Sequence, residues 1–140
     1  MKYFVKATML LTLFAAFTLS LSSCKKDEDE GLLPQISFIT DNGYTSKDAN
    51  MATSTDFKIG IKAAKSEDKD VLTKFTITKS TDGGADNTVF TKDLSGDEAN
   101  SYSYDYAGTT MDKAGNEKYT FTVVNRDGLI NKASLVITVN

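Results

Sequence analysis

Apolar and polar residues alternate over most of the chain, and this period of two constrains the fold more than any other feature. Phe57, Ile59 and Ile61 alternate with polar or small residues. A period of two places every second side chain on one face of a β-strand, whereas a helix needs a period near 3.6. Seven such stretches occur, centred on residues 36–38, 57–61, 75–77, 89–90, 102–106, 119–123 and 135–139. The pattern therefore predicts an all-β domain.

Turn-forming residues separate these stretches. Asn42-Gly43, Asp82-Gly83-Gly84 and Asp127-Gly128 tolerate positive φ angles. Strands with one apolar face bury it by packing two sheets face to face. Because no internal repeat occurs, we expect a single seven-stranded antiparallel β-sandwich over residues 35–140. The long interval 41–55 has room for a short extra strand near residues 50–53.

The first residues have the order of a secretory signal peptide. Lys2 and Lys6 supply positive charge, and residues 7–21 form an apolar run broken only by Thr and Ser. A run of this length is too short to span a hydrocarbon core of about 30 Å with ease. A basic start followed by a short apolar run is typical of a cleaved signal. We expect residues 1–23 to be removed.

The end of that run reads Leu21-Ser22-Ser23-Cys24, and the run 25–30 that follows is charged and mostly acidic. The first motif resembles the bacterial lipobox. That resemblance implies cleavage before Cys24 and lipid attachment to its thiol, with the membrane as partner; an ordinary cleaved signal with a chance cysteine is the alternative. The acidic run resembles the export signal of Bacteroidota lipoproteins, which implies an outer-membrane location facing the cell exterior. A plain spacer is the alternative here. Residues 24–34 would form the lipidated cysteine and its tether.

The C-terminal third carries a second resemblance. Residues 119–125 alternate, Asp127-Gly128 forms a turn, and a last alternating strand ends the sequence. This arrangement is similar to the end of bacterial immunoglobulin-like domains of the fibronectin type III or PKD kind, with Tyr119 as a corner tyrosine. The chain departs from antibody domains because it lacks Trp and has a single cysteine. The resemblance implies an immunoglobulin-like sandwich.

Composition limits the possible chemistry. The chain has one cysteine and no histidine, so an internal disulfide and a Cys/His zinc site are excluded. The net charge is −3 and Arg126 is the only arginine, which argues against nucleic acid as a partner. No phosphate-binding loop or hydrolase elbow occurs. We therefore expect no cofactor and no enzymatic activity.

Two sets of residues remain as candidate sites. Calcium takes oxygen ligands from loops, and Asp82, Asp86, Asp112 and Asn116 are weak candidates for it; ordinary turns are the alternative. Tyr102, Tyr104 and Tyr106 share one strand face and could stack on a sugar. Alternatively they face the core, because the exposed arrangement would bury Asp105.

These features together predict a lipid-anchored cell-surface binding or adhesion module that is not catalytic. An accessory glycan-binding lipoprotein of a polysaccharide-uptake system is one alternative. A structural or assembly component without its own ligand is another. The ligand, a protein or a glycan, is not indicated by the sequence.

Overall fold

The computed structural model describes residues 31–140, which form a compact unit of their own. The expected signal peptide, Cys24 and most of the tether lie outside the described residues. No helix within residues 31–140 is long and apolar enough to cross a membrane.

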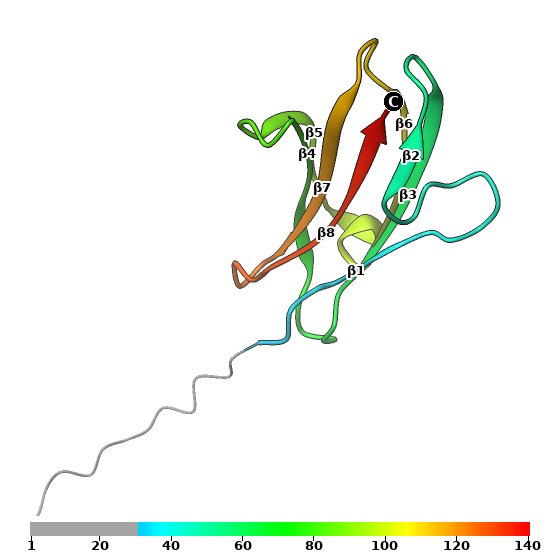
Figure 1. The fold of residues 1–140 in the computed structure, drawn as a ribbon. Helices are drawn as coiled ribbons and strands as arrows, with labels where there is room; N and C mark the ends of the chain where they lie inside the picture. Colours follow the sequence, from blue (N-terminus) through cyan, green and yellow to red (C-terminus); the bar gives the residue numbers. More distant parts are fainter. Residues whose placement is uncertain (1–30) are drawn as a thin grey trace, which may run out of the picture. The chain divides into compact units, whose positions relative to one another are not determined.

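Eight strands and one short 3₁₀ helix make up the unit (Figure 1). They are β1 (Gln35–Phe38), β2 (Ala49–Met51), β3 (Asp56–Ala64), β4 (Leu72–Thr81), β5 (Asn87–Asp93), η1 (Gly96–Ala99), β6 (Ser101–Thr109), β7 (Gly115–Asn125) and β8 (Ile130–Val139). The alternating stretches all fall within strands. The all-β prediction is therefore confirmed.

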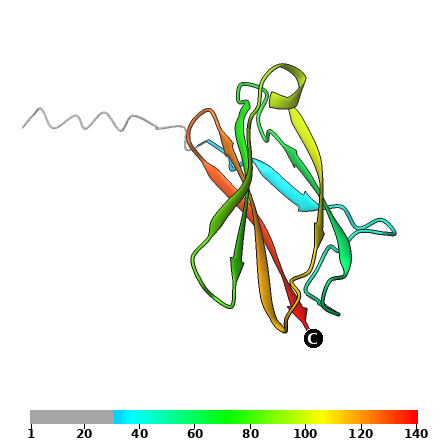
Figure 2. The same cartoon turned by 90° about the horizontal axis from the view of Figure 1, so that it is seen from above.

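The strands form two sheets. One has the order β1-β3-β6 and the other the order β2-β8-β7-β4-β5. Figure 2 shows the two layers, with the segment through η1 carrying the chain from β5 in one sheet to β6 in the other. Side chains from both sheets share one hydrophobic cluster, so the packing is that of a β-sandwich.

The structure differs from the expected seven antiparallel strands in two ways. β2 is an eighth strand, and it lies where the interval 41–55 left room for a short extra one. It pairs in parallel with β8. Its three residues are too few to show a period. Its position is fixed instead by contacts at both ends, where Val136 N donates to Asp48 Oδ1 and Asn140 N donates to the Met51 carbonyl.

The core holds the inward half of each alternating strand. Its members come from β3, β4, β6, β7 and β8, with Leu94 added just after β5, and aromatic rings fill its centre. The Phe75 ring lies 5.2 Å from that of Tyr102, and the Phe57 ring lies 5.4 Å from that of Tyr119. Such ring pairs add to the stability that burial alone provides.

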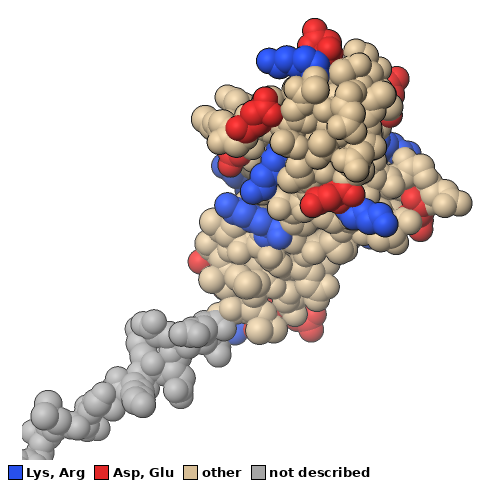
Figure 3. All heavy atoms as spheres, viewed as in Figure 1, with Lys and Arg blue, Asp and Glu red and all other residues tan. Residues whose placement is uncertain are grey.

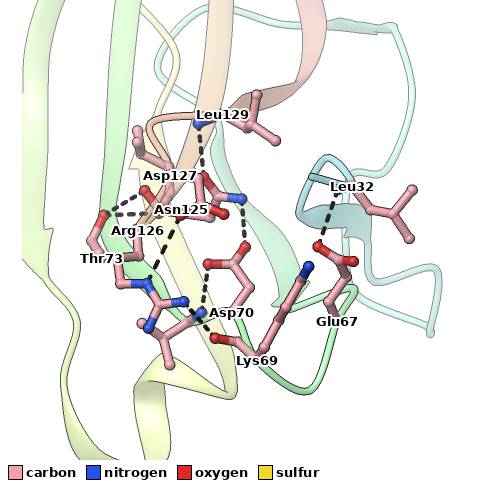
Figure 4. A network of polar contacts seen from close by, with 11 residues as sticks. Leu32, Glu67, Lys69, Asp70, Thr73, Asn125, Arg126, Asp127 and Leu129 are labelled. Atoms are coloured by element: carbon pink, nitrogen blue, oxygen red, sulfur yellow. Dashed lines mark hydrogen bonds and ion pairs between the residues drawn. The ribbon is translucent and has the colours of Figure 1, made fainter. Parts of the chain in front are cut away.

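A polar network closes the end of the sandwich at which the described chain begins (Figure 4). Asp70 and Asn125 are both buried, and Asn125 Nδ2 donates to Asp70 Oδ2 at 2.5 Å. Asn125 Oδ1 accepts from Leu129 N, and Asp70 Oδ1 accepts from Val71 N. The β3–β4 loop is thereby joined to the β7–β8 turn.

Candidate functional site

A buried cluster of charged and polar groups lies at the opposite end of β4 and β7. Lys79 Nζ is 2.5 Å from Glu117 Oε1, and the Tyr119 hydroxyl donates to Glu117 Oε2 at 3.4 Å. The Glu117 side chain is 0% exposed, whereas that of Lys79 is 27% exposed. Among the described residues, Oε1 accepts no well-aligned hydrogen bond, so its partner is the Lys79 charge.

Strand periodicity and register assemble the cluster. Glu117 and Tyr119 are two residues apart in β7, and therefore point to the same face. Lys79 stands opposite Tyr119 in the β4–β7 ladder, which places it diagonally beside Glu117. Cross-strand and diagonal neighbours on one face are within contact distance. An inward-facing glutamate thus acquires a lysine partner from the neighbouring strand.

The Tyr119 hydroxyl is held in its neutral form. Burial raises the pKa of Tyr119 far above its ordinary value of 10.0, and the nearby Glu117 carboxylate raises that pKa further. Tyr106 contributes from the other sheet, with its ring 5.4 Å from that of Tyr119. Lys79 Nζ lies 5.5 Å from the centre of the Tyr119 ring. The hydroxyl is therefore a stable donor to the buried carboxylate.

This arrangement can hold a charge pair and its hydrogen-bond donor in an apolar interior. Lys79 is its connection to solvent, because Glu117 itself has no exposed surface. Buried charges with specific partners are candidate functional sites, although structural pairs share these properties. No group of three or more Asp, Glu, Cys or His side chains suited to a metal ion occurs within residues 31–140.

The tyrosine row lies on the inner face of its sheet. Tyr102 is buried, and Tyr104 and Tyr106 are partly buried against the hydrophobic core. The Tyr104 ring stacks on that of Phe90 from β5 at 4.3 Å. The row is thus divided between the core and the open side of the sandwich near β5.

The calcium candidates are not gathered into one site. Asp82 and Asn116 are joined by their backbones, and Asn116 N donates to Asp82 Oδ1 at 2.7 Å. This bond, with the positive φ of Asp82, fixes a turn. Asp86 and Asp112 are exposed, and neither shares a hydrogen bond with this pair.

Charged side chains of both signs are interspersed over the surface seen in Figure 3. Neither lysines and arginines nor acidic residues gather there into a broad patch of one sign. This face therefore offers no strong field to steer a charged partner.

Sequence reasoning missed the Lys79–Glu117 pair. The alternation predicts a strand that begins at Tyr119, whereas β7 begins at Gly115 and includes Glu117. The signal was present, since Glu117 continues the inward alternation of Tyr119, Phe121 and Val123 by one step. Lys79 likewise continues the inward alternation of Phe75 and Ile77.

Comparisons with known proteins give a likeness of fold alone. No family model matches the chain, and no curated protein matches it in sequence. Superoxide reductase (neelaredoxin) from Ignicoccus hospitalis has a similar structure, with a TM-score of 0.53 and 10% identity over 77% of this chain and 80% of that one. Two further structures of that protein have TM-scores of 0.51 and 0.50, also at 10% identity.

These neighbours overturn the expectation of a non-catalytic binding or adhesion module. The fold that the chain shares with them serves an enzyme. The glycan-binding and assembly alternatives rested on the same reasoning and are withdrawn with it. The expectation that the chain is not an enzyme gains no support from a fold of this kind.

Proposed function

We propose that this chain is a lipid-anchored outer-membrane protein that carries an immunoglobulin-like domain on a short tether. The observation that carries the proposal is the motif Leu21-Ser22-Ser23-Cys24, followed by the acidic run 25–30. Acylated cysteine gives stable anchoring when more than one acyl chain is attached. The acidic run supports an exterior location through its resemblance to the Bacteroidota export signal.

Residues 32–34, the described part of the tether, are bonded to one end of the sandwich. Leu32 N donates to Glu67, Ser66 Oγ donates to the Leu33 carbonyl, and Asn131 Nδ2 donates to the Pro34 carbonyl. These bonds hold residues 32–34 at the end closed by the Asp70–Asn125 network. Cys24 precedes Gly31 by seven residues, and a chain of that length spans at most about 25 Å.

In this proposal the Asp70–Asn125 end therefore stays within about 25 Å of the anchoring lipid. This limit follows from covalent reach alone, since residues 25–30 join Cys24 to Gly31.

The strand order supports the immunoglobulin-like assignment. If β1, β3 and β6 are strands A, B and E, then β8, β7, β4 and β5 are strands G, F, C and C′. Tyr119 lies in the strand that this assignment makes F, where a corner tyrosine is expected. β2 is an addition at the edge of strand G.

Superoxide reduction is not part of the proposal. A reductase needs an electron carrier, and protein metal centres are usually built from His, Cys and carboxylate ligands. This chain has no histidine, and its one cysteine is the proposed lipid site. The residues therefore do not fit a redox metal centre, and no step through such a centre is derived.

Replacing the cysteine tests the anchor. We expect Cys24→Ala to abolish labelling by a radioactive or clickable fatty acid and to move the protein from the membrane to the soluble fraction. Ser22→Ala is the matched control, because alanine keeps the small side chain that this position requires. Membrane retention and lipid labelling of Cys24→Ala would show that the proposal is wrong.

Neutralising the acidic run tests the proposed exterior location separately from the lipid anchor. Changing Asp27, Glu28, Asp29 and Glu30 to Asn or Gln should leave lipid labelling intact. It should also protect the domain from protease added to whole cells. If the neutralised protein is degraded as fast as wild type, the run is only a spacer and the location proposal fails.

A further inference from the structure

The free edge of β6 is long and regular. Among residues 31–140, β6 pairs only with β3, so its other side presents backbone groups that no described strand pairs with. Its register against β3 runs without interruption from Ser101 to Thr109. A long, flat edge strand is a template for pairing with another strand unless charge, proline or a bulge protects it. β6 contains no proline, and its one charged residue is Asp105.

The other three edges of the two sheets are short or protected. β1 has four residues and β2 has three. β5 pairs with β4 through an irregular register near Ile77 and Thr78. It also carries a partly buried charge, since Lys92 Nζ donates to Glu98 at 2.5 Å and lies over the Tyr102 ring. A bulge and an inward-pointing charge are devices that prevent pairing at an edge.

The side chains of β6 make the strand complementary to itself. An antiparallel pair of β6 strands centred on Tyr104 places Tyr104 opposite its own copy and Tyr102 opposite Tyr106 of the second copy. On the other face, Ser103 stands opposite Asp105 of the second copy. Aromatic pairs are favourable cross-strand neighbours, and a serine hydroxyl can donate to a carboxylate. Centring on Asp105 would instead place two carboxylates opposite each other, which is unfavourable.

We propose that β6 pairs with β6 of a second copy of this chain, antiparallel and centred on Tyr104. The two three-stranded sheets then join into one six-stranded sheet with the order β1-β3-β6-β6-β3-β1. The contact is isologous, so it closes as a two-fold dimer and does not propagate into a fibre. Confinement of both copies on one membrane raises their effective concentration and favours the dimer, but the pairing itself does not depend on the anchor.

The test uses residues 31–140, which form a compact unit with their own core. Analytical ultracentrifugation from about 1 μM to about 1 mM covers the range of weak self-association. We expect a concentration-dependent dimer for wild type. Ser103→Asp sets like charges opposite each other at two symmetric positions, and Ser103→Lys sets opposite charges there. The dissociation constant should rise about 2- to 30-fold in the first variant and fall by a similar factor in the second.

Matched controls distinguish pairing at the edge of β6 from pairing at the edge of β5. Thr91→Asp adds the same charge to β5, where Thr91 is exposed, and should leave the dissociation constant unchanged. Ser103 is exposed, so both of its variants should fold, as circular dichroism can verify. Asp at this position faces Lys62 of β3 favourably, whereas Lys faces a like charge there at a small cost in stability. A monomer at every concentration would overturn the proposal. So would a dimer that Thr91→Asp weakens and Ser103→Asp does not, because that result would place the contact at β5.

Discussion

Glu117 is the residue at which the core departs most from an apolar interior. Its carboxylate has no exposed surface, and it is balanced by a lysine that reaches solvent. Transferring a charge into a protein interior costs several kcal/mol, and a close partner of opposite charge offsets that cost. The two members of the pair are therefore not equivalent. Lys79 can extend toward water when its partner is lost, whereas Glu117 cannot.

This asymmetry leads to a prediction for three variants. Lys79→Met should lower the free energy of unfolding by about 3–5 kcal/mol, because it leaves a buried carboxylate without a partner. Glu117→Gln should cost less, since Gln keeps the hydrogen bond from Tyr119 and Lys79 can turn outward. The double variant should come within about 1–2 kcal/mol of wild type, because no uncompensated charge is left. Urea unfolding at neutral pH measures all three values.

Lys74→Met is the matched control for that series. Lys74 pairs with Asp93 at 3.8 Å, but both side chains are more than half exposed, and exposed pairs contribute little. Its loss should change the unfolding free energy by less than about 1 kcal/mol. Equal losses in Lys79→Met and Lys74→Met, or a double variant that is less stable than both single ones, would contradict the view of Glu117 as a buried charge.

At the scale of elements, the sequence predicted the strands whose alternation is long and missed what depends on pairing. β3, β6 and β7 repeat their period over several residues, and each was located from that repeat. β2 has three residues, and the interval 41–55 left room for it, but its parallel pairing with β8 was not predicted. Glu117 was missed for a related reason: the alternation indicates that it points inward, but only the ladder register supplies Lys79 as its partner.

Asn125 connects two elements and supports a second prediction. Its side chain donates to Asp70 and accepts from Leu129 N, which joins the β3–β4 loop to the β7–β8 turn. Asn125→Ala leaves the buried Asp70 oxygen and the Leu129 N–H with one partner fewer, at a cost of about 1–3 kcal/mol. Asn125→Asp should cost more at neutral pH, because it places two carboxylates within hydrogen-bond distance.

Lowering the pH should change the stability of these two variants by different amounts. When the introduced Asp takes up a proton, the repulsion disappears. Relative to Asn125→Ala, the Asn125→Asp variant should therefore gain stability between pH 7 and about pH 4, as measured by thermal unfolding. A difference between the two that stays constant across this range would show that residue 125 does not face the Asp70 carboxylate.

For the whole molecule, the sequence indicates a location and an architecture more readily than an activity. The lipobox-like motif is contiguous, so it can be read directly from residues 21–24. The two-layer architecture follows from alternation repeated along the chain. An activity depends on side chains that meet from different strands, as Lys79, Glu117 and Tyr106 do here. At 10% identity, two proteins of the same fold can differ in most of their interior side chains. The shared fold therefore does not indicate which side chains meet in this protein.

The stability of the whole domain should decline at alkaline pH because of its buried tyrosines. Burial raises the pKa values of Tyr119 and Tyr102 in the folded state above the ordinary 10.0. Above about pH 10 the unfolded chain releases these protons while the folded chain retains them, so the unfolded state binds fewer protons and stability falls as pH rises. Below pH 10 both states are protonated, and these residues add no pH dependence. Thermal unfolding between pH 8 and 11 should show this loss, and Tyr119→Phe should make the decline shallower although it removes a hydrogen bond. An equally steep decline in Tyr119→Phe would mean that Tyr119 ionises as readily in the folded protein as in the unfolded chain.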